Sequence, residues 1–203
     1  MTRKRVAILI SGRGSNMAAL IAAAKAPDYP AEIDLVVSSG SVAPGIGAAA
    51  AEGIETVALS AKSFGDRTAF ERSLHLTLTR ARIELICLAG FMRILSAEFV
   101  ANWRDRMINI HPSLLPAFPG LDTHARALAA GAAEHGCTVH FVRAGVDDGP
   151  IIKQTAVPVL PGDTPETLAE RVLAAEHKLY PEVLALVASG RVRVEGEKAV
   201  IDR

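Results

Sequence analysis

Short apolar runs alternate along the chain with longer stretches of amphipathic pattern. The apolar runs predict strands at residues 6–10, 33–37, 55–59, 85–89 and 107–110. The stretches between them predict helices at residues 16–26, 44–51, 66–82 and 96–102. Fully apolar strands separated by amphipathic helices are typical of a parallel sheet that helices cover on both faces. We therefore predict a three-layer α/β fold with a mostly parallel, open sheet.

The pattern changes in the last third of the chain. Residues 137–142 and 151–157 predict two strands, and only a short glycine-containing segment separates them. Strands joined so closely are usually neighbours in a sheet, and we expect this pair to extend the sheet with antiparallel strands. Residues 164–188 predict a final helix, and residues 191–203 predict a short hairpin or a loose tail.

Three residues mark the final helix. Thr164 is suited to cap its start, and Pro165 fits the first helical position, where a backbone N–H is not needed. Pro181 removes a hydrogen-bond donor inside the helix, so it is expected to kink or interrupt it. With no clear linker along the chain, we expect one domain that spans residues 1–203.

Composition and charge narrow the class of protein. The chain has 203 residues, of which 50% are hydrophobic, and this is enough for the core of one domain. Lys plus Arg and Asp plus Glu both number 22, so a basic surface for nucleic acid is not expected. The basic start, residues 1–5, precedes an apolar run too short for an export signal or a membrane span. Cys87 and Cys137 predict buried, reduced thiols in a cytoplasmic protein.

A glycine-rich segment, residues 11–16, follows the first strand and opens the first helix. Gly12 and Gly14 permit a tight turn close to an anion, and the free N–H groups at the helix start favour a phosphate. Met17 stands where the dinucleotide-binding motif needs a third small residue, and the Walker lysine is missing. The segment therefore predicts a monophosphate site, with a plain tight turn as the alternative.

A second candidate site lies in residues 109–116, at the end of the fifth predicted strand. Strand alternation places Asn109 and His111 on one side, and ligands gather at the carboxyl ends of parallel strands. Pro112 restricts the backbone of His111 and ends the strand. An amide and an imidazole side by side can both donate to the oxygen of a carbonyl under attack, as acyl transfer requires. The alternative is that both side chains only satisfy a turn.

Asp147 and Asp148 occupy a loop that can return over the same end of the sheet. A carboxylate beside His111 would orient the imidazole ring and favour its charged form. It would also hold a water molecule that carries protons between reacting groups. Spacing alone does not distinguish Asp147 from Asp148, and a solvated turn is the alternative for both.

Together these motifs resemble those of the folate-dependent formyltransferases, and among them the phosphoribosylglycinamide formyltransferases. The resemblance runs over residues 5–190 and is carried by residues 10–16, 88–95, 109–116, 140–142 and 147–150. It implies a Rossmann-like formyltransferase fold and transfer of the formyl group of 10-formyltetrahydrofolate, a co-substrate, to the amine of 5-phosphoribosylglycinamide in purine synthesis. It also implies a monomer or homodimer that needs no metal, nucleic acid or membrane.

The resemblance assigns roles to individual residues. Asn109 and His111 match groups that stabilise the oxyanion, and Asp147 matches a carboxylate that moves a proton through water. The implied contacts to the nucleotide substrate come from Gly14, Ser15, Asn16 and Glu176. The implied contacts to folate come from Arg67, Met92, Arg93, Ile94, Leu95 and Asn109, and from a closing loop of Arg143, Ala144, Gly145, Val146 and Asp147.

The resemblance further divides the single domain. Residues 1–100 would bind phosphate, residues 101–190 would carry catalysis and folate binding, and residues 191–203 would form a tail. Two positions depart from the family pattern, since Ala117 stands where Lys is frequent and Asp122 where His is frequent. These departures concern local substrate contacts and leave the trio of Asn109, His111 and Asp147 intact.

The other histidines have simpler interpretations. His124 is expected to open a helix, with a place near the site as the alternative. His140 alternates with apolar residues, so an inner histidine on a strand is expected rather than a base. His75 and His135 are expected at the surface. A zinc site of His111, His140 and Asp147 is not favoured, because no short-range pair of ligands supports it.

Three other functions stay open from the sequence. A formyltetrahydrofolate hydrolase would be expected to carry a regulatory domain ahead of the sheet, whereas the first predicted strand begins at Val6. A methionyl-tRNA formyltransferase would be expected to carry a further C-terminal domain and basic character. A nucleotide-binding module without catalysis would explain the glycine-rich segment but not the trio.

Overall fold

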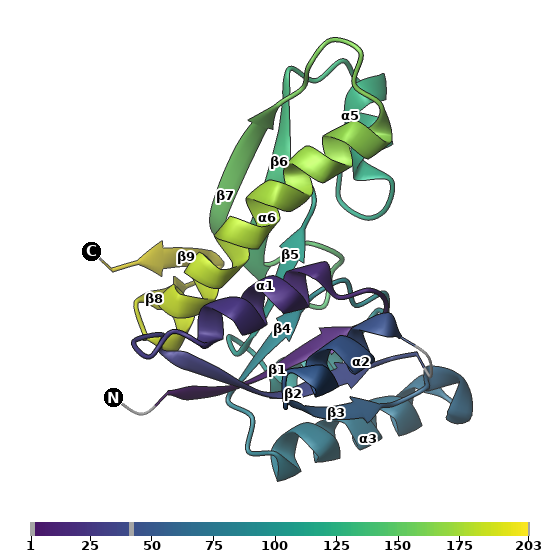
Figure 1. Cartoon of the computed structure of the whole chain (residues 1–203), viewed down its shortest axis with the longest axis vertical. Coiled ribbons are helices and arrows are strands. Elements are labelled where there is room, and N and C mark those ends of the chain that lie inside the picture. Colours follow the sequence, from purple (N-terminus) through teal and green to yellow (C-terminus); the bar gives the residue numbers. More distant parts are fainter. Residues whose placement is uncertain (1–2, 41–42, 203) are drawn as a thin grey trace.

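A seven-stranded sheet runs through the centre of the computed structural model, which describes residues 3–40 and 43–202 (Figure 1). Its strand order is β3-β2-β1-β4-β5-β6-β7, and a separate two-stranded hairpin consists of β8 and β9. Residues 1–2 of the basic start and Arg203 of the predicted tail lie outside the described residues. The strands are β1 (Lys4–Ile10), β2 (Ala31–Ser38), β3 (Glu55–Ala58), β4 (Leu85–Leu88), β5 (Met107–His111), β6 (Glu134–Phe141), β7 (Ile151–Pro158), β8 (Val192–Glu195) and β9 (Lys198–Ile201).

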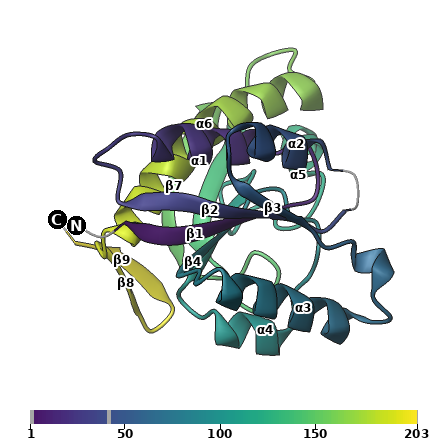
Figure 2. The same cartoon turned by 60° about the horizontal axis from the view of Figure 1, so that its bottom comes forward.

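Helices cover both faces of this sheet. Figure 2 shows α1, α2 and α6 on one face and α3 and α4 on the other. Along the chain, a short 3₁₀ helix precedes α3, and α5 belongs to the segment that connects β5 to β6. The α-helices are α1 (Ser15–Ala24), α2 (Pro44–Ala51), α3 (Arg67–Arg80), α4 (Ala97–Asn102), α5 (Thr123–Ala129) and α6 (Pro165–Ala188).

Two hydrophobic layers hold the helices to the sheet. Alternate residues of β1 point to opposite faces, so Ile8 packs in one layer and Leu9 in the other. The first layer contains Leu184 of α6, and the second contains Phe70 of α3. Every residue of β1 from Val6 to Ile10 is fully buried, as expected for a strand that helices cover on both sides.

The predicted fold is confirmed. Neighbours among β1 to β5 pair in parallel, whereas β6 and β7 extend the sheet with antiparallel pairing. The predicted strands and helices recur with small shifts at their ends, and the two alternatives for the last residues resolve into the β8–β9 hairpin. In residues 3–40 and 43–202, no helix has the length and apolar character that a bilayer crossing requires.

The sequence predicts that Pro181 kinks or interrupts the last helix. The predicted interruption is wrong, because α6 runs unbroken from Pro165 to Ala188. The proline costs one intrahelical hydrogen bond. The residues around it compensate, since Tyr180, Val183 and Leu184 are fully buried against the sheet. The hydroxyl of Tyr29 also donates to the carbonyl of Pro181 at 2.7 Å. The predicted caps are present, with Thr164 as N-cap and a proline in the first turn.

The surface position expected for His135 is also wrong, because only 1% of this residue is exposed. Every residue of β6 after Glu134 is buried. His135 packs edge-to-face against His124 and Phe118, with ring centroids 5.2 and 6.0 Å away. Burial lowers the pKa of His135 to about 4, so the ring is neutral at pH 7. The predicted thiols of Cys87 and Cys137 are buried and free.

Candidate active site

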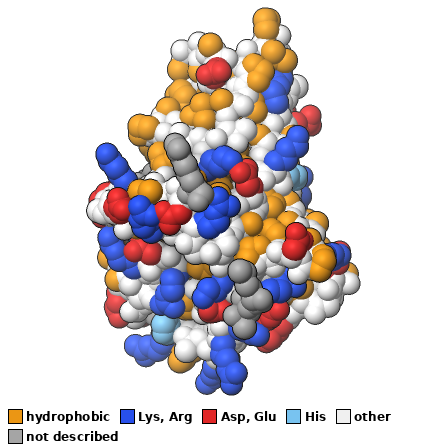
Figure 3. Space-filling view, turned by 90° about the vertical axis from the view of Figure 1, so that its left-hand side faces the viewer, with side chains coloured by type: hydrophobic (Ala, Val, Ile, Leu, Met, Phe, Trp, Pro, Cys, Tyr) orange, Lys and Arg blue, Asp and Glu red, His pale blue; other side chains and the backbone are white. Residues whose placement is uncertain are grey.

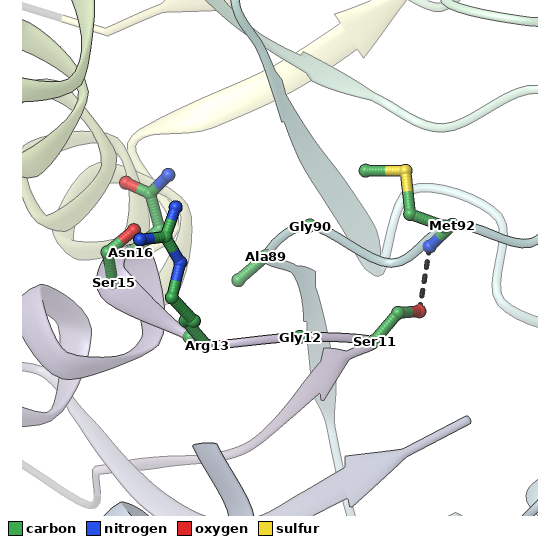
Figure 4. A pocket seen from close by; sticks show the side chains of 9 residues that line it. Ser11, Gly12, Arg13, Ser15, Asn16, Ala89, Gly90 and Met92 are labelled. Carbon is green, nitrogen blue, oxygen red and sulfur yellow. Dashed lines mark hydrogen bonds between the residues drawn. The ribbon is translucent and has the colours of Figure 1, made fainter. Parts of the chain in front are cut away.

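The carboxyl ends of β1 and β4 bring two loops together. Ser11, which follows β1, donates its N–H to the carbonyl of Gly90 at 3.1 Å. The Oγ atom of Ser11 accepts the N–H of Met92 at 2.8 Å, as Figure 4 shows, and lies 2.7 Å from Oγ of Ser39. These contacts fix the glycine-rich segment against the segment that follows β4. The two predicted binding segments are therefore neighbours in space.

A cavity of about 270 Å³ opens between these two segments (Figure 4). Gly14 precedes α1 with φ of 76°, in the left-handed region where glycine is favoured. Among the described residues, no side chain caps this helix start. Its N–H groups and the positive end of the helix dipole are thus available to an anion. The cavity is lined by Ser11, Gly12, Arg13, Gly14, Ser15, Asn16, Ala89, Gly90 and Met92.

Glu176 of α6 reaches the same helix start. Nδ2 of Asn16 donates to Oε2 of Glu176 at 2.7 Å, and 9% and 6% of the two residues are exposed. Burial raises the pKa of Glu176, while the hydrogen bond from Asn16 acts in the opposite direction. Within the described part of the chain, the buried Oδ1 of Asn16 has no hydrogen-bond partner. The structure thus brings together the four residues predicted to contact the nucleotide, with one buried acceptor still unused.

His111 ends β5 and lies beside Asp147. Its Nδ1 atom is 3.2 Å from Oδ2 of Asp147, and its Nε2 atom is 3.0 Å from the carbonyl of Phe118. Both neighbours are hydrogen-bond acceptors when Asp147 is ionised. Both contacts are then attractive only if both ring nitrogens of His111 carry a hydrogen. Burial alone would raise the pKa of Asp147. Three effects outweigh burial and hold the pKa low, namely the contact with His140, the hydrogen bond from the N–H of Gly120, and the charge on His111. The geometry therefore favours an imidazolium–carboxylate pair.

Asn109 is joined to this pair by a residue that the sequence did not single out for the site. Nδ2 of Asn109 lies 3.2 Å from Nε2 of His140, whose Nε2 is also 3.8 Å from Oδ1 of Asp147. His140 was expected to be an inner histidine, and it is 2% exposed. It nevertheless belongs to the cluster. The signal is the antiparallel register, which sets Asn109 opposite His140, and this pairing cannot be derived from strand patterns alone.

The loop that carries Asp147 is closely tied at its end. Gly149 has to be glycine, because a Cβ atom there would lie 1.6 Å from the carbonyl oxygen of Phe141. Asp147 itself adopts φ of 53°, which Asp tolerates better than most residues. Oδ2 of Asp147 accepts the N–H of Gly120 at 2.9 Å. Asp147 rather than Asp148 thus contacts both His111 and the loop after β5.

The predicted folate residues fall into two groups. Met92, Ile94 and Val146 are apolar but exposed by 69%, 67% and 56%, which suits a surface that receives an aromatic ligand. Ala144 and Gly145 are exposed as well. Leu95, in contrast, is 7% exposed and packs in the core, so its side chain is not available to a ligand.

The predicted arginines differ in their surroundings. The guanidinium of Arg93 lies 5.5 Å from the ring centre of Phe70 in α3, and Arg67 begins that helix with Nε 4.0 Å from Glu71. Both arginines are exposed. Only 9% of the Arg143 side chain is exposed, and ion pairs with Asp105 and Glu197 engage it. Its guanidinium is therefore already occupied.

The two departures from the family pattern lie in the loop after β5. Ala117 is exposed, and its carbonyl accepts the hydroxyl of Ser113 at 2.6 Å. Asp122 precedes α5 with φ of 56°. His124 lies in the first turn of α5, as expected, and burial together with the charge of His111 lowers its pKa. His124 therefore opens a helix, as expected, and is also close enough to His111 for the charge of that ring to affect it.

Comparison with known proteins decides the family. Residues 4–184 match the family described as Formyl transferase. The chain belongs to the formyl transferase family. Within the described residues, no group of three or more His, Cys, Asp or Glu side chains is arranged to hold a metal ion.

Relatives of this formyl transferase chain are similar over nearly its whole length. Phosphoribosylglycinamide formyltransferase of Escherichia coli is 42% identical over 97% of this chain and 93% of its own length. The trifunctional purine biosynthetic protein adenosine-3 of Drosophila pseudoobscura pseudoobscura is 55% identical, but the chain spans only 14% of that protein. Among solved structures, glycinamide ribonucleotide transformylase 1 from Symbiobacterium toebii has a TM-score of 0.96 and 43% identity, over 99% of this chain and 95% of that one.

Proposed function

We propose that this chain transfers the formyl group of 10-formyltetrahydrofolate to the amine of 5-phosphoribosylglycinamide, giving the formylated ribonucleotide and tetrahydrofolate in purine synthesis. The observation that carries the proposal is the convergence of Asn109, His111 and Asp147 at the same sheet edge as a glycine-rich helix start. The Escherichia coli phosphoribosylglycinamide formyltransferase supports the same reaction, because the two chains match over nearly their full lengths.

The nucleotide substrate has a matching set of groups in the first half of the chain. Its phosphate would lie against Gly14, Ser15 and the start of α1, where N–H groups and the helix dipole favour an anion. Its ribose hydroxyls would donate to Glu176 and to the unused Oδ1 atom of Asn16. In this arrangement, the buried acceptor of Asn16 gains the partner that buried polar groups usually have.

The acyl-transfer step would use Asn109 and His111 on the formyl oxygen. The amide of Asn109 has two N–H groups, and only one of them is needed for the contact with His140. His111 would exchange the carbonyl of Phe118 for the oxyanion, since the ring already carries the hydrogen that this bond requires. Asp147 would keep the imidazolium charged during the step. Each such donor is worth about 10²–10³ in kcat.

The proton balance of the reaction assigns a second task to Asp147. The substrate nitrogen attacks the formyl carbon, and the bond from this carbon to N10 of the folate breaks. The proton of the attacking amine must reach N10, and a water molecule held by Asp147 would carry it. Help of this kind contributes about 10²–10⁴ in rate. The low pKa of Asp147 suits this task, because the carboxylate stays ionised and can accept from water.

The folate would lie over the exposed apolar side chains of Met92, Ile94 and Val146. Backbone groups of residues 92–95 and of the loop at residues 143–147 would read the edge of the pterin. Arg67 and Arg93 are exposed cations, and they suit the carboxylates at the other end of a folate. The folate takes part as a co-substrate, and the proposed reaction needs no metal.

The proposal treats residues 1–203 as one domain, with phosphate binding in residues 1–100 and catalysis and folate binding in residues 101–190. The buried free thiols of Cys87 and Cys137 suit work in the reducing cytoplasm. The protein would act as a monomer or a homodimer.

One assay tests the function. The chain is incubated with 10-formyltetrahydrofolate, with and without 5-phosphoribosylglycinamide, and release of tetrahydrofolate is followed. Release that requires the ribonucleotide and yields its formyl derivative supports the proposal. Release without the ribonucleotide would show a hydrolase instead, and no release in either case would show a binding module.

A further inference from the structure

Arg143 begins the loop that carries Asp147, and acids from two other parts of the chain hold its side chain. Its Nη2 atom lies 2.7 Å from Oδ1 of Asp105, and its Nε atom lies 3.3 Å from Oε2 of Glu197. Nη1 donates to the carbonyl of Val142 at 3.2 Å. Only 9% of the arginine side chain is exposed, against 42% and 68% for the two acids. Arg143 is thus the buried centre of this cluster.

The two acids come from different segments. Asp105 lies between α4 and β5 and adopts φ of 57°. Glu197 lies in the turn between β8 and β9, and its Oε1 atom is 3.3 Å from Nη2 of Arg104. The terminal hairpin, which follows the region of the family match, is therefore bound to the start of the Asp147 loop. Figure 3 views the side on which Figure 1 places this hairpin, and acidic and basic side chains lie interspersed there.

The conformation of the Asp147 loop depends on its two ends. At the first end, the N–H of Val142 donates to the carbonyl of Met107 at 2.9 Å, directly before Arg143. At the second end, the N–H of Phe141 donates to the carbonyl of Pro150 at 2.9 Å. The residues between them, 144–146, are exposed. Because residues 144–146 are not held by neighbouring elements of the described chain, we expect a displacement of the first end to reach Asp147.

We propose that Arg143 is a positioning residue for formyl transfer, and that its clamp on Asp105 and Glu197 orders the loop at residues 143–148 before folate binds. This inference rests on the proposed function, in which that loop covers the pterin and Asp147 assists the reaction. Arginine suits the position, because its rigid planar fork holds two carboxylates in fixed directions, whereas the ammonium of lysine is a rotating point charge. The β8–β9 hairpin thereby acts on the active site from outside it, through Glu197.

The clamp can be broken without changing Arg143. In the full chain, the double variant Asp105→Asn and Glu197→Gln removes both negative charges, and asparagine tolerates the φ of position 105. Arg143→Met removes the guanidinium but keeps an apolar stem. Glu195→Gln is the matched control, because Glu195 belongs to the same hairpin but pairs with Arg193. The readouts are hydrogen exchange of the amides at residues 143–148 without ligands, and kcat and KM for each substrate.

Arg143→Met and the acid double variant are each expected to raise both the loop exchange rate and the KM for 10-formyltetrahydrofolate about tenfold. This effect is smaller than the ~10²-fold loss that a 1 Å misplacement can cause. The KM for the ribonucleotide is expected to stay within about twofold, because its predicted contacts lie on α1 and α6. Combining all three substitutions is expected to add little to Arg143→Met, and Glu195→Gln is expected to match wild type.

Two results would overturn the proposal. If Arg143→Met raises the KM for folate but the acid double variant behaves as wild type in both readouts, Arg143 contacts folate directly instead. If neither variant changes loop exchange, the clamp does not order the loop. Hydrogen exchange is measured without turnover, so it tests the clamp even if the protein has no activity. A wild-type chain that transfers no formyl group would refute the proposed function but not the clamp.

Discussion

Asn109 and His140 face each other across β5 and β6, with Nδ2 of the amide 3.2 Å from Nε2 of the ring. The other ring nitrogen, Nδ1, lies 2.9 Å from the carbonyl of Phe141. A carbonyl only accepts, so Nδ1 donates to Phe141 and the ring is held in one orientation. Its Nε2 atom then faces both Asn109 and, at 3.8 Å, Oδ1 of Asp147, and this contact restricts the plane of the amide.

We therefore expect His140 to orient Asn109. His140→Leu removes the polar ring that contacts Asn109 and should lower kcat about tenfold, since a misplaced donor loses part of its effect on the transition state. His140→Gln offers an amide oxygen to Asn109 and should recover part of the loss. Steady-state kinetics measure both variants, and His75→Leu, outside the site, is the control. A His140→Leu enzyme with normal kcat would contradict this role.

Asp147 and its neighbour Asp148 form a natural pair of variants. Asp147→Asn should lose at least about two orders of magnitude in kcat, because it removes the carboxylate that holds the proton-carrying water and the charge beside His111. Asp148→Asn changes an exposed side chain and should keep nearly full activity. Near-normal turnover of Asp147→Asn would remove Asp147 from the mechanism.

We expect the same carboxylate to set the acid limit of activity. The pKa of Asp147 is held below its ordinary value of 3.8, so the group stays charged at all higher pH values. Its contribution is present above that value and is lost as pH falls through the lowered pKa. Between pH 4 and 9, the profile of kcat/KM should therefore show no acid limb that depends on Asp147. Any acid limb of wild type in this range should also be present in Asp147→Asn. An acid limb near pH 5 or 6 that this variant abolishes would contradict the assignment.

The sequence predicts the fold well where one physical signal dominates. Apolar runs such as that of β1 have to be buried, and the helices between them need cover for one face, so the layered sheet follows. Pro181 does not interrupt α6, and the rule for a proline inside a helix misses this because it does not include the packing of Tyr180 and Val183 against the sheet. His135 misleads because its burial depends on the packing of His124 and Phe118 against it, and both belong to other segments of the chain.

The candidate site shows the same limit. Asn109 and His111 share a strand, so their proximity follows from alternation. The place of Asp147 depends on a loop conformation that the family resemblance supplies and residue spacing does not. His140 is found only through the register of β5 with β6. The contacts of Arg143 with Asp105 and Glu197 join three loops, and no local pattern encodes such long-range ion pairs.

Glu176 should trade stability for binding. Burial raises the pKa of Glu176, so the fold favours its neutral form, and stability falls as pH rises through the raised pKa. Glu176→Gln keeps an acceptor for Asn16 without the charge. The variant should be more stable than wild type at pH 8, and the difference should shrink near pH 4, where wild-type Glu176 is neutral.

Binding should change in the opposite direction. Loss of a charged acceptor for ribose hydroxyls should raise the KM for the ribonucleotide about tenfold, which corresponds to about 1.4 kcal/mol. Urea unfolding at the two pH values and steady-state kinetics test the two effects. Glu170→Gln, an exposed position on α6, is the control for both. A Glu176→Gln protein with unchanged KM would exclude a contact to the nucleotide.

Gly149 should be the glycine least tolerant of replacement near the Asp147 loop. A Cβ atom there would overlap the carbonyl oxygen of Phe141 at 1.6 Å, and this oxygen belongs to β6, which cannot retreat without breaking the sheet. Gly149→Ala should cost more than about 3 kcal/mol of unfolding free energy, or displace the loop and abolish activity. Gly47→Ala in α2 meets no atom within 4 Å and should stabilise by about 0.5–1 kcal/mol. Urea unfolding and kcat compare the two, and a stable, active Gly149→Ala protein would show that the loop has another conformation in solution.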